Sequence, residues 1–300
     1  MELLISILLA IYSSIFLVGF TGNLLMVLVT FYSKNLRSIC NLLICASCFC
    51  DLLLFTDILA FIYSFFVDIT QEHCFYMNIA ADFGAFASNA FVLVVGIDRL
   101  IAVARPARAI QVFVDVNGVS RHLRIGTSLH WISTKKPEQV ICLLPESLGH
   151  AYDLFAMTSL VINVFVPPIY IYVYFRIKRI RMNSSMKAVF KSLMVTVCLV
   201  VCGWMTTDLI GALTVTIPMN RDIAKMIQLY CGTFIFTSSG LNALVYYKYS
   251  RDYRNAMRTM LGIANETNAL KSTTYKEATD AQRSSVQRQT TSANAVTSHF

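Results

Sequence analysis

Six stretches of this chain of 300 residues are apolar over the length that a helix needs to cross a lipid bilayer. They lie near residues 3–31, 40–66, 75–103, 151–175, 188–217 and 226–247. About 20 apolar residues in a helix cover the hydrocarbon core of a membrane. The chain is therefore predicted to be all-α, a multi-span bundle of transmembrane helices.

The overall composition agrees with a membrane protein. Only 14% of the residues are charged and 56% are apolar, whereas a soluble domain carries about 25% charged residues. The net charge of +8 comes mainly from basic residues at the ends of the apolar stretches and in the tail, so we expect membrane lipid rather than nucleic acid as a partner.

Basic residues at the ends of the spans predict how the chain is oriented. No Lys or Arg precedes Lys34, whereas Lys34 and Arg37 follow the first span, and Arg99 at the end of the third span is followed by Arg105 and Arg108. Because such residues are retained on the cytoplasmic side, we expect a multi-pass protein of the plasma membrane with its amino terminus outside. The predicted organisation is a bundle with a surface helix over residues 1–262 and a disordered cytoplasmic tail over 263–300.

Polar motifs inside the spans resemble those of the rhodopsin-like G-protein-coupled receptors. The first three spans carry Asn23 in TGNLL, Asp51 in CDLL, and Cys74 ahead of Asp98 and Arg99 in IDRL; later spans carry Trp204 in VCGWMTTD, Asn242 and Tyr246 in NALVY, and then Tyr253. The segments KNLRSICNLLI and GIDRLIAV are most similar to the nematode chemoreceptors called serpentine receptor class sx.

The resemblance implies a receptor of the seven-helix type rather than an enzyme. Its partners would be an extracellular small-molecule or peptide ligand, a heterotrimeric G protein and arrestin. The residues implied in coupling and activation are Asp98, Arg99, Trp204, Asn242, Tyr246 and Tyr253, with Tyr246 closing onto Arg99 in the active state. A disulfide between Cys74 and Cys142 is expected on the oxidising outer side.

The sequence departs from the receptor pattern at three positions. Leu100 replaces the usual Tyr after Asp-Arg, and Thr206 and Ala243 replace prolines of the sixth and seventh helices. Because glycines also bend helices, we expect bends at Gly203 and Gly240 instead.

Asp51 is a carboxylate in an apolar span, which costs several kcal/mol unless it is paired. The resemblance places four further polar residues around it: Asn23, Ser88, Ser239 and Asn242. Together they are expected to hold a sodium ion or a water cluster, and a static polar core is the alternative. No other cofactor and no metal site are expected.

Three acids, Asp57, Asp82 and Asp208, are predicted to border the outer half of the bundle near Trp204, and no Lys or Arg lies in the same outer segments. Such an excess of acids favours a cationic ligand. The alternative is that each acid caps or bonds a neighbouring helix.

After the last span, YKYSRDYRNAMRTML is predicted to form a short helix on the membrane surface, because it has one apolar face and several basic residues on the others. The Ser- and Thr-rich tail beyond it suits phosphorylation and arrestin docking, although a solvated linker has the same composition.

The fourth transmembrane helix is predicted to be missing. Between Arg99 and Cys142 no apolar run exceeds VICLL, far short of the roughly 20 residues that a span requires. We therefore expect residues 107–145 to be irregular, and the chain to derive from an incomplete gene model or from a decayed gene with a non-functional product.

The main competing function is that of a small transporter or channel that uses the intramembrane acids Asp51, Asp57 and Asp208. Transporters of this kind are built from repeats, and no repeat is visible in the sequence. An intramembrane enzyme is disfavoured because there is no HExxH motif and no histidine within a span.

Overall fold

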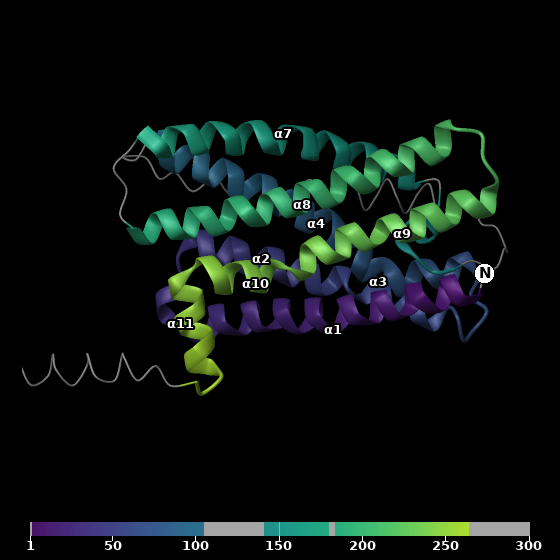
Figure 1. The fold of residues 1–300 in the computed structure, drawn as a ribbon, viewed down its shortest axis with the longest axis horizontal. Coiled ribbons are helices and arrows are strands. Elements are labelled where there is room, and N and C mark those ends of the chain that lie inside the picture. The colour runs from purple at the N-terminus through teal and green to yellow at the C-terminus, as the bar shows by residue number, and fades with distance from the viewer. Residues whose placement is uncertain (1, 105–140, 150, 180–183, 264–300) are drawn as a thin grey trace, which may run out of the picture. The chain divides into compact units, whose positions relative to one another are not determined.

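The computed structural model describes residues 2–104, 141–149, 151–179 and 184–263, and its regular elements there are helices. In chain order they are α1 (Glu2–Tyr32), η1 (Lys34–Leu36), α2 (Ile39–Leu54), α3 (Thr56–Tyr63), α4 (Gln71–Ala104), α6 (Leu144–Leu148), α7 (Ala151–Arg179), α8 (Ser184–Thr216), α9 (Arg221–Gly240), α10 (Asn242–Tyr249) and α11 (Arg251–Met260) (Figure 1). The predicted all-α class is confirmed.

The chain divides into two compact units, Met1–Arg254 and Asn255–Phe300, with the boundary inside α11. The first unit is the helical bundle. The predicted helix after the last span is present as α11. The predicted tail lies almost wholly outside the described residues, so its disorder stays a prediction.

Five helical segments of the described chain are long and apolar enough to cross a membrane: Leu3–Tyr32, Ile39–Tyr63, Gln71–Ile101, Leu154–Arg176 and Leu193–Thr214. The sixth predicted span, 226–247, is not among them, and it is divided between α9 and α10 at Leu241. The bend expected at Gly240 is thus found at the next residue, whereas α8 continues through Gly203 without a break.

The helices of the bundle pack through their larger apolar side chains. Helix α4 packs against α2 and α7, α9 packs against α8 and α1, and α10 packs against α8. In the interior the Tyr12 ring lies 5.0 Å from that of Phe61 and 5.6 Å from that of Phe236, measured between centroids. On the outside, Leu17 is 63% exposed and Phe165 is 60% exposed, which suits a surface that faces lipid rather than water.

The predicted disulfide between Cys74 and Cys142 is present. It joins α4 to the segment that leads into α6. The proposed gap in place of a fourth helix falls on residues 105–140, outside the described residues. At the end of the segment predicted to be irregular, α6 begins at Leu144, and Pro145 occupies a first-turn position where a helix tolerates proline.

Candidate functional site

A cavity of about 110 Å³ lies in the bundle, lined by residues of α1, α2, α3, α6, α7, α8 and α9. Aromatic side chains form much of its wall, namely Tyr12, Tyr152, Phe155, Trp204 and Phe236. Three acids, Asp57, Glu146 and Asp208, also line it, and no Lys or Arg is among the described residues around it. A mostly apolar cavity with a few polar groups is the usual form of a small-molecule site.

The three predicted pocket acids have different surroundings. Asp57 and Asp208 line the cavity, whereas Asp82 does not. The Ser147 hydroxyl of α6 lies 3.1 and 3.3 Å from the two carboxylate oxygens of Asp82, so this acid fastens α6 to α4. Asp82 thus bonds a neighbouring helix and is not among the residues that line this cavity, and its role toward a ligand stays a prediction.

Asp57 is fully buried and receives a short hydrogen bond. The Asn78 side-chain amide of α4 donates to its Oδ1 over 2.6 Å. Asn78 itself is buried, and its own carbonyl oxygen has no partner among the described residues. Asp57 thus has one oxygen committed to a structural contact between α3 and α4.

Asp208 belongs to a chain of polar residues that the sequence analysis missed. The Ser159 hydroxyl donates to its Oδ2 over 3.4 Å, while the side-chain amides of Asn89 and Asn163 donate to the Ser159 oxygen over 2.8 and 3.3 Å. Asn163 is also within hydrogen-bonding reach of Asp208. The available signal was the presence of two asparagines inside the apolar spans 75–103 and 151–175.

Glu146 was also missed as a residue of the cavity wall. It lies in α6, and the disulfide at Cys142 holds the start of this segment against α4. Leu143 and Leu144 from the same segment line the cavity as well. The proximity of Glu146 to a predicted disulfide cysteine was the only sign of this in the sequence.

Trp204, predicted from the resemblance, lies at the wall of this cavity. Its side chain is 2% exposed and its ring centroid is 6.1 Å from that of Phe155. The indole N–H has no partner among the described residues. The cavity therefore offers one buried hydrogen-bond donor in addition to its acids.

The predicted cluster around Asp51 is assembled from five helices, α1, α2, α4, α9 and α10. Ser88 of α4 donates to Asp51 Oδ1 over 2.6 Å, and Asn242 of α10 donates to Oδ2 over 2.7 Å. Ser239 is within hydrogen-bonding reach of the same carboxylate. The Asn23 amide donates to the carbonyl oxygens of Gly19 and Ser239, both over 3.0 Å.

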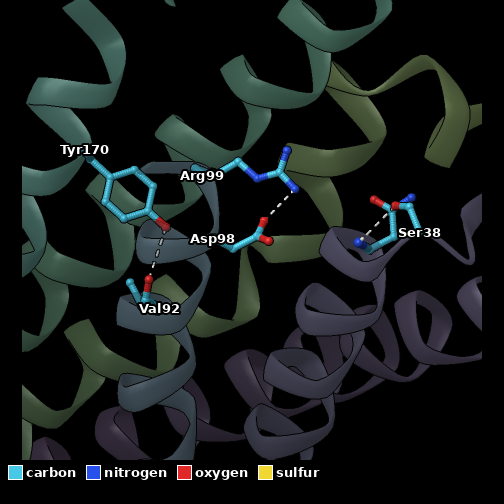
Figure 2. Close-up of polar contacts among 6 residues, drawn as sticks. Ser38, Val92, Asp98, Arg99 and Tyr170 are labelled. Carbon is cyan, nitrogen blue, oxygen red and sulfur yellow. Dashed lines mark hydrogen bonds and ion pairs between the residues drawn. The ribbon is translucent and has the colours of Figure 1, made fainter. Parts of the chain in front are cut away.

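Near the other end of α4, Asp98 and Arg99 pair with each other. The distance from Arg99 Nη2 to Asp98 Oδ2 is 2.8 Å, and the Arg99 side chain is 21% exposed (Figure 2). Figure 2 also shows Tyr170 of α7 pointing at α4, where its hydroxyl donates to the Val92 carbonyl over 3.1 Å. The guanidinium is thus held at the bundle border and remains partly open to solvent.

Tyr246 is buried and packs on another ring instead of on Arg99. Its centroid is 5.1 Å from that of Tyr253, and the Tyr253 hydroxyl is 3.5 Å from the Thr30 hydroxyl. Burial raises the pKa of Tyr253 well above its ordinary value, so this phenol stays neutral. A smaller cavity of about 30 Å³ lies between Tyr246, Tyr170 and Asn242, which is room for about one water molecule.

The comparisons with known proteins agree with this arrangement of motifs. No curated protein matches the chain. The model of one protein family, described as serpentine type 7TM GPCR chemoreceptor Srsx, matches residues 16–261. That match includes the Asp51 cluster, the Asp98–Arg99 pair and most of the residues lining the larger cavity, which contains Trp204. The chain belongs to this family of multi-pass membrane chemoreceptors, which are receptors and not enzymes.

Proposed function

We propose that this chemoreceptor binds a small cationic molecule in the outer cavity and signals to a heterotrimeric G protein on the opposite side of the membrane. The observation that carries the ligand class is the cavity itself, which has three acids and no Lys or Arg among its described lining residues. In a desolvated site such an excess of negative charge favours a cation over a neutral molecule.

Asp208 is the acid best suited to pair with the ligand. It is only partly buried and it lines the cavity. Asp57 is buried and engaged by Asn78 over 2.6 Å. The aromatic walls add to the preference, because ring faces attract ammonium groups.

The amino terminus and the disulfide end face outward in this proposal, and the end with Arg99 faces the cytoplasm. Lys34 and Arg37 follow α1 and Lys248 lies in α10, which fits the retention of basic residues on the inner side. Opening of the bundle at this cytoplasmic end would expose Arg99 in a groove that an amphipathic helix of the G protein can occupy. Ligand shifts the balance between closed and open states because it binds one of them more tightly.

The Asp51 cluster would connect the ligand-binding end of the bundle with the end that carries Arg99. The buried carbonyl oxygen of Asn23 has no partner among the described residues, so it is free to bind a water molecule or a sodium ion together with Asp51 and Ser88. Such an ion would neutralise the Asp51 carboxylate. We also propose that α11 lies along the inner leaflet and that arrestin binds the tail once the tail is phosphorylated.

The experiment is nucleotide exchange on a co-expressed G protein, with phenethylamine and its neutral counterpart 2-phenylethanol as probes. The proposal predicts a response to the amine at lower concentration than to the alcohol, and a loss of at least about tenfold in amine potency in Asp208→Asn. Asp68→Asn is the matched control, since Asp68 is exposed and does not line the cavity. Equal potency of wild type and Asp208→Asn, or flux of the amine without exchange, contradicts the proposal.

A further inference from the structure

The Ser159 hydroxyl of α7 stands at the centre of four polar residues from three helices. It contacts Asn89 of α4, Asn163 of its own helix and Asp208 of α8. Asn89 is 1% exposed, Asn163 0% and Ser159 1%. Three polar side chains this deeply buried are costly unless they bond to one another or serve a purpose.

The direction of the Ser159 proton follows from the chemistry of its neighbours. A hydroxyl has one proton to donate and two lone pairs that accept. A carboxylate only accepts, whereas an amide can turn its NH₂ group toward an acceptor. The proton therefore goes to Asp208, and the two asparagine amides fill the lone pairs of the Ser159 oxygen.

In this arrangement the side-chain amide nitrogens of Asn89 and Asn163 both donate to Ser159. The Oδ1 atoms of Asn89 and Asn163 are left buried with no partner among the described residues. Two unpaired buried acceptors are the cost of directing both amides at one hydroxyl. Such a cost indicates that the position of Ser159 matters for more than packing.

We propose that Asn89 and Asn163 fix Ser159 as a positioning residue, which holds one oxygen of Asp208 and so sets the receptor's preference for cationic over neutral ligands. This rests on the proposed function, because it needs Asp208 to pair with the ligand. A hydrogen bond to a charged group contributes more free energy than one between neutral groups. Without the bond from Ser159, the Asp208 carboxylate is therefore a less well placed partner for an ammonium ion.

Ser159→Ala removes the hydroxyl at almost constant volume, and Ser159→Thr restores it. Thr158→Ala is the matched control, because the neighbouring Thr158 hydroxyl donates to the Leu154 carbonyl of its own helix, over 2.8 Å. The measured quantity is the ratio of potencies of phenethylamine and 2-phenylethanol. It should fall about tenfold in Ser159→Ala, recover in Ser159→Thr and stay unchanged in Thr158→Ala.

A second measurement needs no ligand. The infrared bands of the Asp208 carboxyl group, identified by their loss in Asp208→Asn, should shift in Ser159→Ala and in Asn89→Ala but not in Thr158→Ala. A change of packing alone would leave the carboxyl bands in place. Unshifted bands in Ser159→Ala overturn the positioning role.

The outcomes separate this inference from the proposed function. If Asp208→Asn lowers the potency ratio and Ser159→Ala does not, the positioning role is wrong and the ligand class stands. If Asp208→Asn also leaves the ratio unchanged, or the wild type responds to neither probe, the proposed cationic ligand fails and the specificity role of Ser159 fails with it.

Discussion

Asn242 of α10 donates its side-chain amide to the carboxylate of Asp51 in α2 over 2.7 Å, across 191 residues of sequence. Both side chains are buried. The bond lies directly after the break at Leu241, where α9 gives way to α10. It therefore fixes the position of α10, which carries Tyr246.

Loss of this bond should destabilise the bundle. Asn242→Ala leaves a buried carboxylate with one donor fewer, which costs about 1.5 to 3 kcal/mol. Thermal unfolding of the purified receptor in detergent should occur at a lower temperature, whereas Asn255→Ala, at an exposed position of α11, should leave the midpoint unchanged. Equal midpoints for the two variants would show that the contact contributes nothing to stability.

Gly203 permits the close approach of α8 to α9. A Cβ atom there would lie 2.5 Å from Ser238 Oγ and 2.9 Å from the Phe234 carbonyl oxygen. Gly203→Ala should therefore cost about 1 to 3 kcal/mol through overpacking and reduce the yield of folded protein. Gly211→Ala in the same helix is the control, since nothing lies within 4 Å of its added Cβ. A Gly203→Ala protein as stable as the control would contradict this view of the helix contact.

The disulfide between Cys74 and Cys142 should be needed to keep the segment that leads into α6 stably attached to α4. Its loss in Cys142→Ser removes a crosslink typically worth about 2 to 5 kcal/mol in small secreted domains and should lower surface expression and ligand response. Cys198→Ser is the control, because Cys198 is an exposed free thiol. Mass spectrometry without reducing agent should find the Cys74 and Cys142 peptides joined, and free thiols at both positions would refute the pairing.

The missing fourth helix remains a prediction about residues 105–140. Sequencing of the native transcript should reveal an inserted apolar stretch of about 20 codons near residues 109–140, because the chain must cross the bilayer between Arg99 and Cys142. An unchanged transcript whose product reaches the cell surface and signals would disprove it.

The sequence predicted the helices, because the length of an apolar segment depends on one helix alone. It also named Ser88 and Asn242 as neighbours of Asp51, because these residues follow a recognisable family pattern, and the structure shows both contacts. It did not reveal the partner of Asp82, because Ser147 comes from the distant helix α6. The polar chain through Ser159 was missed for the same reason, since contacts between Asn89, Asn163 and Asp208 require knowledge of how three helices face one another.

The most direct test of the whole account is ligand-stimulated nucleotide exchange by Arg99→Ala. Arg99 is partly exposed and pairs only with its neighbour Asp98 among the described residues, so its removal should leave folding, surface expression and phenethylamine binding near wild-type levels. Exchange on the G protein should fall to the level of membranes without receptor. Wild-type exchange by a well-expressed Arg99→Ala receptor would contradict the claim that this chain signals through the inner end of α4.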